Sequence, residues 1–546
     1  MKPRILWCGE FSQLKTGYAV YAHEVMSRWF STNKYELAEH ASYAHRSDSR
    51  IQNVPWQLYA NLPDSDNQEE VNRYNSSPTN QFGEWRFEDI CIDFKPHIVV
   101  SILDFWMMSH QYRSPLRQCF NLTQMPTCDA YPQNEEWLSS YESCDGIFTY
   151  QDWSKQVLDF ESAGKIKTLG SASPAADDAF KPMDRESIKR SVGLENYKIV
   201  GTVMRNQRRK LFPDLFGAFK VFLETSKRTD ILLYCHTSYP DMGWDIPKLL
   251  LQYGLSSKVL FTYVCRECGH AHPNFFNDAL MSCPRCKRMT SAVSNVQSGV
   301  DNQCLAAIMN MFDLCIGWSN SEGCGIPILE ASACGTPCIG VDYSAMSDTL
   351  RKLGGIPIQP LALTMELETG CFRAVPNNDI LIDKFDLFFN KLTEQQRLGL
   401  RTETRKKYLE NYSWDTTAKK WENYFDTVNV EYYEKMWHTP PQYVNIPNDF
   451  PKGLSNPQFA KWLIIHVLGE PRYLNSYMES RLIRDLNYEV TNMGIAGMYF
   501  NDQSALFSKP NWTSFNQETA FKHFRELGNR KNFWENKRWT AIQTKK

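Results

Sequence analysis

The chain has 546 residues, with 60 Lys and Arg against 62 Asp and Glu, so its formal net charge is −2 at pH 7. This length allows two or three domains with substantial cores, and the nearly neutral charge lacks the overall positive footprint of a nucleic-acid-binding protein. Because no apolar run approaches the roughly 20 residues that cross a bilayer, we expect a soluble protein of the cytoplasm with no membrane span.

Residues 1–182 alternate apolar, strand-like runs with helical patterns. The first run, residues 5–8, is too short for the core of a signal peptide and predicts a strand. A loop then leads through Gly17 to a helix that begins near Tyr18. Further strands are expected at residues 98–103 and 146–149, and the polar stretch 47–83 is expected to be an insertion or an acceptor-side loop.

A second alternating series occupies residues 183–415. Strands that alternate with helices indicate parallel sheets built from βαβ units, and the expected strands are residues 199–204, 231–235, 259–262, 314–318 and 338–341. Two such series predict an α/β fold of two doubly wound, Rossmann-like domains that face each other across a cleft, where ligands bind beyond the C-terminal ends of the strands.

Four of the 16 cysteines form two C-x2-C motifs, separated by 14 residues: Cys265, Cys268, Cys283 and Cys286. Two such motifs supply the four thiolates of a closed, tetrahedral Zn²⁺ site, which is structural and not catalytic. We therefore predict a zinc ribbon at residues 263–290, inserted after the strand at 259–262. A redox pair of dithiols is the alternative. Most other cysteines stand singly in apolar runs, which favours a reducing compartment.

A glycine-rich turn between two predicted strands carries two glutamates eight positions apart, Glu322 and Glu330. Pro327 suits the first position of the helix that follows, which would place Glu330 in the first helical turn. Gly323 and Gly325 let backbone N–H groups approach a ligand closely at the positive end of the helix dipole. The pattern is typical of a site for a polyhydroxylated, phosphorylated ligand.

This turn resembles the E-x7-E signature of the GT-B glycosyltransferases, in particular the retaining family 4 (glycosyl transferases group 1), and the following "EASACGTP" agrees with it. The resemblance covers residues 1 to about 430. It implies a UDP-sugar donor, with Glu322 on the sugar hydroxyls and Glu330 on the ribose. Cys324 stands where the family has a large apolar residue. The donor-binding stretch would be Gly323, Cys324, Gly325 and Ile326.

The same resemblance assigns roles elsewhere along the chain. Arg205 and Lys210 match the family's "GR-x4-K" phosphate clamp, with Arg209 assisting. Gly17 lies in the first turn, where the family places glycine backbone against the donor. Asp129 stands where many relatives carry a histidine near the reacting sugar. No catalytic metal is expected. The implied arrangement is an acceptor-side domain (1–182), a nucleotide-sugar domain (183–415), and a crossing helix with a C-terminal extension (416–546).

The last 38 residues hold nine Lys and Arg against three Glu, interleaved with aromatic residues. Two interpretations are open. In the first, a helical tail packs on the core and leaves a basic face in solvent. In the second, this tail and the basic residues of the zinc ribbon contact the acceptor, with aromatic rings stacking on bases or sugars.

Three hypotheses for the overall function follow. Long bacteriophage transferases look similar in layout, including an "NSEG" turn, a "DYSAMSD" segment and a cysteine-knuckle insertion, which favours transfer to a hydroxymethylated pyrimidine in phage DNA, within the host cytoplasm. The alternative acceptor is a glycan, lipid or protein. A hypothesis of a different class is a non-enzymatic nucleic-acid-binding module in which the cleft is vestigial.

Overall fold

The first half of the molecule contains a parallel sheet. The computed structural model describes residues 1–295, 298–468, 476–488 and 516–544. Within them, seven parallel strands pair in the order β3-β2-β1-β4-β5-β6-β7. Their bounds are β1 (Arg4–Glu10), β2 (Glu36–Ser42), β3 (Gln57–Ala60), β4 (Ile98–Ser101), β5 (Asn121–Gln124), β6 (Gly146–Thr149) and β7 (Thr168–Ser171).

Helices and short helical turns connect these strands. They are α1 (Gly17–Ser31), η1 (Ser49–Asn53), α2 (Gln68–Asn75), η2 (Pro78–Phe82), η3 (Glu84–Arg86), α3 (Phe87–Phe94), α4 (Phe105–Tyr112), η4 (Arg117–Cys119), α5 (Glu135–Glu142) and α6 (Asp152–Glu161). The polar stretch 47–83 is more ordered than the insertion or loop expected from its composition, because it supplies β3, the edge strand of this sheet.

The second half contains a mixed sheet. Among the described residues its strands pair in the order β12-β13-β10-β9-β8-β14-β15-β16, and β11 pairs with β10. The bounds are β8 (Lys198–Val203), β9 (Ile231–His236), β10 (Val259–Cys265), β11 (Ala271–Phe275), β12 (Met281–Ser282), β13 (Met289–Val293), β14 (Leu314–Gly317), β15 (Cys338–Val341) and β16 (Ile356–Ile358). A separate hairpin consists of β17 (Ala362–Met365) and β18 (Phe372–Val375).

The helices of this half are α7 (Arg185–Ser191), α8 (Phe212–Ser226), α9 (Ile246–Tyr253), α10 (Asn302–Met311), α11 (Ile326–Ala333), α12 (Ala345–Leu353), α13 (Asn378–Asp386), η5 (Leu387–Lys391) and α14 (Glu394–Asn411). The strand expected at 259–262 continues to Cys265, because β11 and β13 pair with it antiparallel on its two sides. The strands of the cysteine insertion therefore form part of this sheet.

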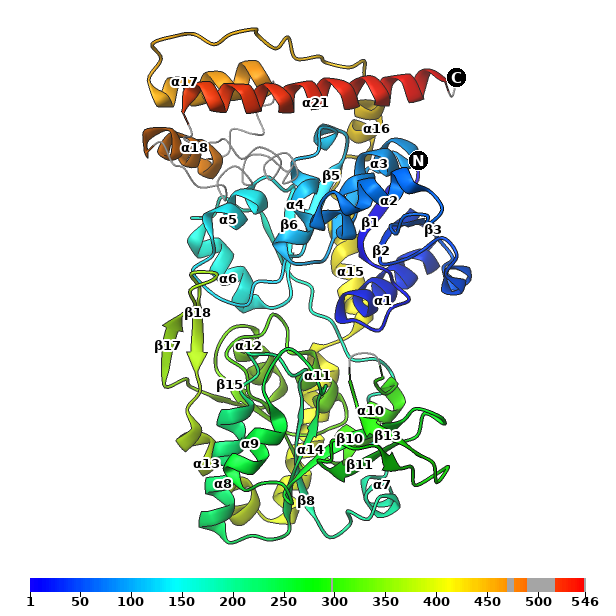
Figure 1. Cartoon of the computed structure of the whole chain (residues 1–546), viewed down its shortest axis with the longest axis vertical. Coiled ribbons are helices and arrows are strands. Elements are labelled where there is room, and N and C mark those ends of the chain that lie inside the picture. Colours follow the sequence, from blue (N-terminus) through cyan, green and yellow to red (C-terminus); the bar gives the residue numbers. More distant parts are fainter. Residues whose placement is uncertain (296–297, 469–475, 489–515, 545–546) are drawn as a thin grey trace.

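After α14 the chain returns to the first half, as Figure 1 shows. Helix α15 (Trp414–Phe425) packs against α1. The Trp421 indole donates to the Tyr21 hydroxyl at 2.9 Å, and the Trp29 indole donates to the Ala418 carbonyl at 3.2 Å. These buried aromatic contacts anchor the crossing segment and tie the two halves together.

The remaining elements are α16 (Val430–His438), α17 (Asn456–Leu463), η6 (Ile464–Leu468), α18 (Ser476–Tyr488) and the long α21 (Gln517–Thr544). Helix α21 lies across the first half in Figure 1. Its aromatic residues Phe521, Phe524 and Trp534 are buried, and Lys537 pairs with Asp89 at 2.5 Å. Among the described residues, no helix combines the length and the hydropathy needed to span a membrane.

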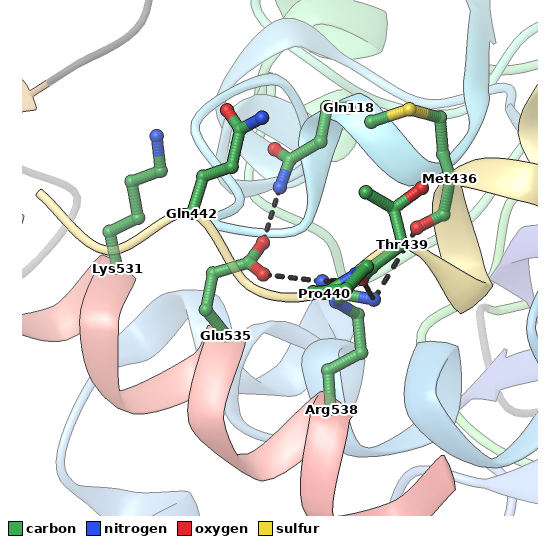
Figure 2. Close-up of a pocket in the computed structure, with 8 residues that line it drawn as sticks. All are labelled: Gln118, Met436, Thr439, Pro440, Gln442, Lys531, Glu535 and Arg538. Atoms are coloured by element: carbon green, nitrogen blue, oxygen red, sulfur yellow. Dashed lines mark hydrogen bonds and ion pairs between the residues drawn. The ribbon is translucent and has the colours of Figure 1, made fainter.

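A small cavity of about 90 Å³ shows how α21 is attached. Glu535 and Arg538, both buried, pair at 2.5 Å. Glu535 also accepts from the Gln118 amide, and Arg538 donates to the Thr439 carbonyl (Figure 2). Arg538 also donates to the Trp437 carbonyl at 2.7 Å. The described part of the tail thus fits the packed-helix interpretation. Of the basic and aromatic residues expected there, the following lie outside the described residues: Lys509, Trp512, Phe515, Lys545 and Lys546.

Candidate functional site

The C-terminal ends of the two sheets meet at one junction. The Trp153 backbone N–H, at the start of α6, donates to Asp348 on α12. At the start of α1, a Cβ added to Gly17 would lie 3.2 Å from Ile326 Cδ1, and one added to Gly323 would lie 2.4 Å from Thr127 Cγ2. The segments that the sequence analysis assigned to the donor therefore face each other across this junction.

The glycine-rich turn begins α11 one residue earlier than expected. Gly325 has φ = 76° and precedes the helix, which starts at Ile326, so Pro327 takes the second position. A proline is tolerated there because none of the first four N–H groups has a partner within the helix. Glu330 is consequently the fifth residue of α11 and lies beyond its first turn, not within it. Glycine suits position 325 because of this positive φ, and a Cβ there would also lie 2.5 Å from Met346 Sδ.

The N-terminus of α12 holds the main chain of Glu322 from both sides. The Glu322 N–H donates to Ser344 Oγ at 2.9 Å, and its carbonyl accepts from the Ala345 N–H at 3.2 Å. Ser344 has φ = 54° and ψ = −149°, a region normally restricted to glycine and costly by about 1–3 kcal/mol. The backbone is thus strained where it fixes Glu322.

Two cations surround the Glu322 carboxylate. One oxygen is paired with Lys210 Nζ and the other with Arg209 at 2.9 Å. Burial alone would raise the pKa of Glu322, but the charges of Lys210 and Arg209 outweigh it and lower the pKa to about 2. Lys210 is itself buried, between β8 and α8. The carboxylate and both cations therefore form one charged cluster at the junction.

Arg205, expected in the phosphate clamp, points elsewhere. Its guanidinium pairs with Asp241 at 2.9 Å, and its side chain is 46% exposed. Arg209, expected only to assist, contacts Glu322 directly. Arg205 would have to exchange Asp241 for phosphate in order to act on a donor.

Asp129 belongs to a second charged group, which links the two halves. Arg373 donates to Asp129 at 3.1 Å and to Ser321 Oγ at 2.8 Å, and it pairs with Glu366 at 2.8 Å. The Ser321 hydroxyl donates to Asp129 at 3.2 Å. Sequence reasoning missed Arg373, whose only signal is an arginine in the short strand β18. It orients Asp129 and fastens the β17–β18 hairpin to the first half.

Glu330 differs electrostatically from Glu322. Burial raises its pKa to about 8, and the negative charge of Asp177 adds to the shift. Within the part of the chain that the structure describes, no ion pair involves its side chain. Burial therefore favours the protonated form of this carboxyl group more than in an ordinary glutamate. Its oxygens remain for a ligand that can supply hydroxyl donors.

The four cysteines of the ribbon converge. Their Sγ atoms all lie within 4.8 Å of one another, and the Cys265–Cys286 and Cys268–Cys283 pairs are 3.6 and 3.7 Å apart. A tetrahedron with Zn–S bonds of about 2.3 Å has S···S edges of about 3.8 Å, so the cluster fits Zn²⁺. These contacts join one C-x2-C motif to the other, which fits a single four-ligand site better than two separate dithiols.

Comparisons with known proteins agree with this geometry. Residues 287–363, which include both glutamates, match the family model for Glycosyl transferases group 1. Three solved structures are similar. A sucrose-phosphate synthase from Thermosynechococcus elongatus aligns with a TM-score of 0.53 and 14% identity, over 79% of this chain and 100% of that chain. HepE of Anabaena in complex with UDP and glucose (TM-score 0.51, 10% identity) and an α,α-trehalose-phosphate synthase (UDP-forming) from Burkholderia vietnamiensis (TM-score 0.52, 11% identity) each align over 78% of this chain and 100% of their own.

At these identities the likeness establishes the fold. The chain has the GT-B fold with a four-cysteine cluster, as the sequence analysis predicted. No curated protein matches the sequence.

Proposed function

We propose that this protein is a retaining glycosyltransferase that moves a hexosyl or pentosyl group from a UDP-sugar to a hydroxyl acceptor. The observation that carries the proposal is the convergence of Lys210, Arg209 and Glu322 at the junction of the two sheets, on the turn that leads into the helix of Glu330. The match to Glycosyl transferases group 1 and the UDP in the HepE complex support it. Such a convergence disfavours a vestigial site in a non-enzymatic module.

Each group has a distinct role in this proposal. Lys210 and Arg209 neutralise the diphosphate, because guanidinium and ammonium groups match phosphate oxygens. Arg205 joins them when it exchanges Asp241 for phosphate. Glu322 accepts hydrogen bonds from the sugar, and Glu330 from the ribose. The backbone at Gly17 and at residues 323–326 approaches the donor closely. Asp129, oriented by Arg373, faces the reacting sugar.

The reaction needs positioning and charge stabilisation more than a protein nucleophile. The resemblance to retaining family 4 and to long bacteriophage members supports attack of the acceptor on the face that the leaving UDP occupies. The protein then lowers the barrier by orienting both substrates and stabilising the developing diphosphate charge. Residues 1–182 form the acceptor side, 183–415 the nucleotide-sugar side, and 416–546 the crossing helix and extension. Zinc serves the ribbon alone, and the reaction takes place in the cytoplasm.

Two classes of acceptor follow from the sequence: a hydroxymethylated pyrimidine in phage DNA, and a glycan, lipid or protein. Contact of DNA with α21 is disfavoured, because Arg530, Lys537 and Arg538 pair with carboxylates of the protein itself. The zinc ribbon keeps exposed basic residues, namely Arg266, Arg285, Lys287 and Arg288, of which Arg288 pairs with Glu267.

Loss of the Lys210 ammonium is expected to slow UDP release from a UDP-sugar by about 10²–10³-fold, the usual effect of removing one group that stabilises transition-state charge. Release is measured on a panel of UDP-sugars, with the products identified by mass spectrometry. Lys210→Met is compared with Lys220→Met, a surface lysine on α8. Equal rates for the two variants would refute the assigned role, and no turnover of any nucleotide sugar by the wild type would refute the function.

Uridine binding is expected to strengthen as pH rises from 6 toward 8. Ribose hydroxyls donate to the ionised form of Glu330, so below its pKa of about 8 binding must first remove a proton. Affinity then rises by up to about tenfold per pH unit. Calorimetry with uridine, which carries no phosphate to titrate, measures the effect. Glu330→Gln should bind uridine with no slope in this range; a slope that persists would assign it to another group.

A further inference from the structure

Three neighbouring strands of the first sheet end in carboxyl and aromatic groups. Glu10 is the last residue of β1, Tyr43 follows β2 directly, and Asp104 and Trp106 follow β4 at the start of α4. Because β2, β1 and β4 are adjacent and parallel, these side chains share one edge of the sheet. In open α/β sheets this is the edge where ligands bind.

The two carboxylates at this edge bond to hydroxyl groups. Asp104 accepts from the Tyr18 hydroxyl at 2.9 Å, and Glu10 accepts from the Thr16 hydroxyl. Burial and the nearby charge of Asp104 raise the pKa of Glu10, although the Thr16 bond opposes them. In the described ranges neither carboxylate has an ion-pair partner. Both retain acceptor capacity for further hydroxyl donors.

Two aromatic rings beside them are open to solvent. Trp106 is 50% exposed and Tyr43 is 37% exposed. Both contact the buried Phe82 edge to face: the ring centroids of Trp106 and Phe82 are 4.9 Å apart, and those of Tyr43 and Phe82 are 6.1 Å apart. Phe82 therefore holds both rings at the same edge of the sheet. Rigid aromatic faces next to hydroxyl-accepting carboxylates are suited to a ring that is apolar on its face and polar at its rim.

This edge lies next to the transfer point. The Tyr18 hydroxyl that bonds Asp104 is also 2.8 Å from Thr127 Oγ1, and Thr127 abuts Gly323, the neighbour of Glu322. A molecule held by Asp104 and Trp106 therefore lies on the acceptor side of the donor sugar. The groups around the donor diphosphate are cationic, whereas those at this edge are anionic and aromatic.

We propose that Glu10, Asp104, Tyr43 and Trp106 form an acceptor subsite for a neutral carbohydrate ring. This inference rests on the proposed glycosyl transfer and names its acceptor class. Trp106 stacks on the ring, and the carboxylates accept its hydroxyl groups. One acceptor oxygen bonds to the anomeric carbon as the bond from that carbon to UDP breaks, and its proton passes to the departing phosphate. The two carboxylates repel a phosphodiester backbone.

The test measures UDP release from the donor that the panel identifies, with glucose, maltose and a duplex containing 5-hydroxymethylcytosine as acceptors. A saccharide is expected to accelerate release. Trp106→Ala should raise its KM about tenfold or more, because the ring face on which the sugar stacks is lost, with a smaller change in kcat. Trp106→Phe should recover most of the affinity. Phe160→Ala, an exposed aromatic on α6, is the matched control.

Asp104→Asn provides a second variant if Trp106→Ala does not fold, and it should also raise the saccharide KM. Acceleration by the duplex and by no saccharide would overturn the inference while leaving glycosyl transfer intact. An unchanged saccharide KM in both variants would overturn the location of the subsite. Failure of every donor to release UDP would instead refute the proposed function.

Discussion

Replacement of Glu322 by glutamine is expected to slow sugar transfer strongly and, at the same time, to strengthen the binding of UDP. In the structure the Glu322 carboxylate pairs with both Lys210 and Arg209, the cations assigned to the diphosphate. A donor must therefore displace this carboxylate, which then becomes available to the sugar hydroxyls. Glutamine keeps the shape but removes the competing charge. We expect transfer to fall by about 10²–10³-fold and UDP affinity to rise several-fold, up to about tenfold for 1.4 kcal/mol.

Calorimetric titration with UDP and a UDP-release assay separate the two effects. Glu224→Gln, at the surface of α8, should change neither quantity. The affinity gain should shrink at high salt, because Arg209 is partly exposed and its pairing is screened. Weaker UDP binding by Glu322→Gln would show that the carboxylate supports the donor phosphates and does not compete with them.

Replacement of Cys283 by serine is expected to produce the largest loss of stability and to release the metal. Cys283 is buried, and its Sγ lies 3.7 Å from that of Cys268. Zinc contributes about 10–16 kcal/mol of binding free energy in isolated zinc-finger peptides, an upper bound here, since β11 and β13 also pair with β10. Losing a ligand should therefore loosen the strands that cover one edge of the second sheet.

Elemental analysis should find one zinc per chain in the wild type and a fraction of that in Cys283→Ser, together with a lower Tm. A chelator should lower the Tm of the wild type toward that of the variant. Cys304→Ser, which replaces a half-buried cysteine on α10 outside the cluster, should keep its zinc. A metal-free wild type with an unchanged Tm in Cys283→Ser would contradict the zinc site.

Local patterns were enough to predict the framework. The apolar runs at β1, β8 and β14 are the buried strands that their composition indicates, because strands of a parallel sheet are covered on both faces. The cysteine spacing predicted the cluster, since both C-x2-C motifs lie within one short insertion. The eight-residue spacing of Glu322 and Glu330 likewise placed one in a turn and the other in the helix that follows. All of these features depend on residues close together in the chain.

Contacts between distant segments needed the tertiary structure. Arg209 and Arg205 are four residues apart, but only the fold shows that one meets Glu322 and the other Asp241. Arg373 bonds to Asp129, 244 residues away in the sequence, and Lys537 on α21 pairs with Asp89 in the first half of the chain. The sequence by itself therefore indicated several strands of each sheet, the four-cysteine cluster and the turn and helix that carry the two glutamates. The partner of each charge was decided by which loops the two sheets bring together, because electrostatic pairing depends on separation in space and not along the chain.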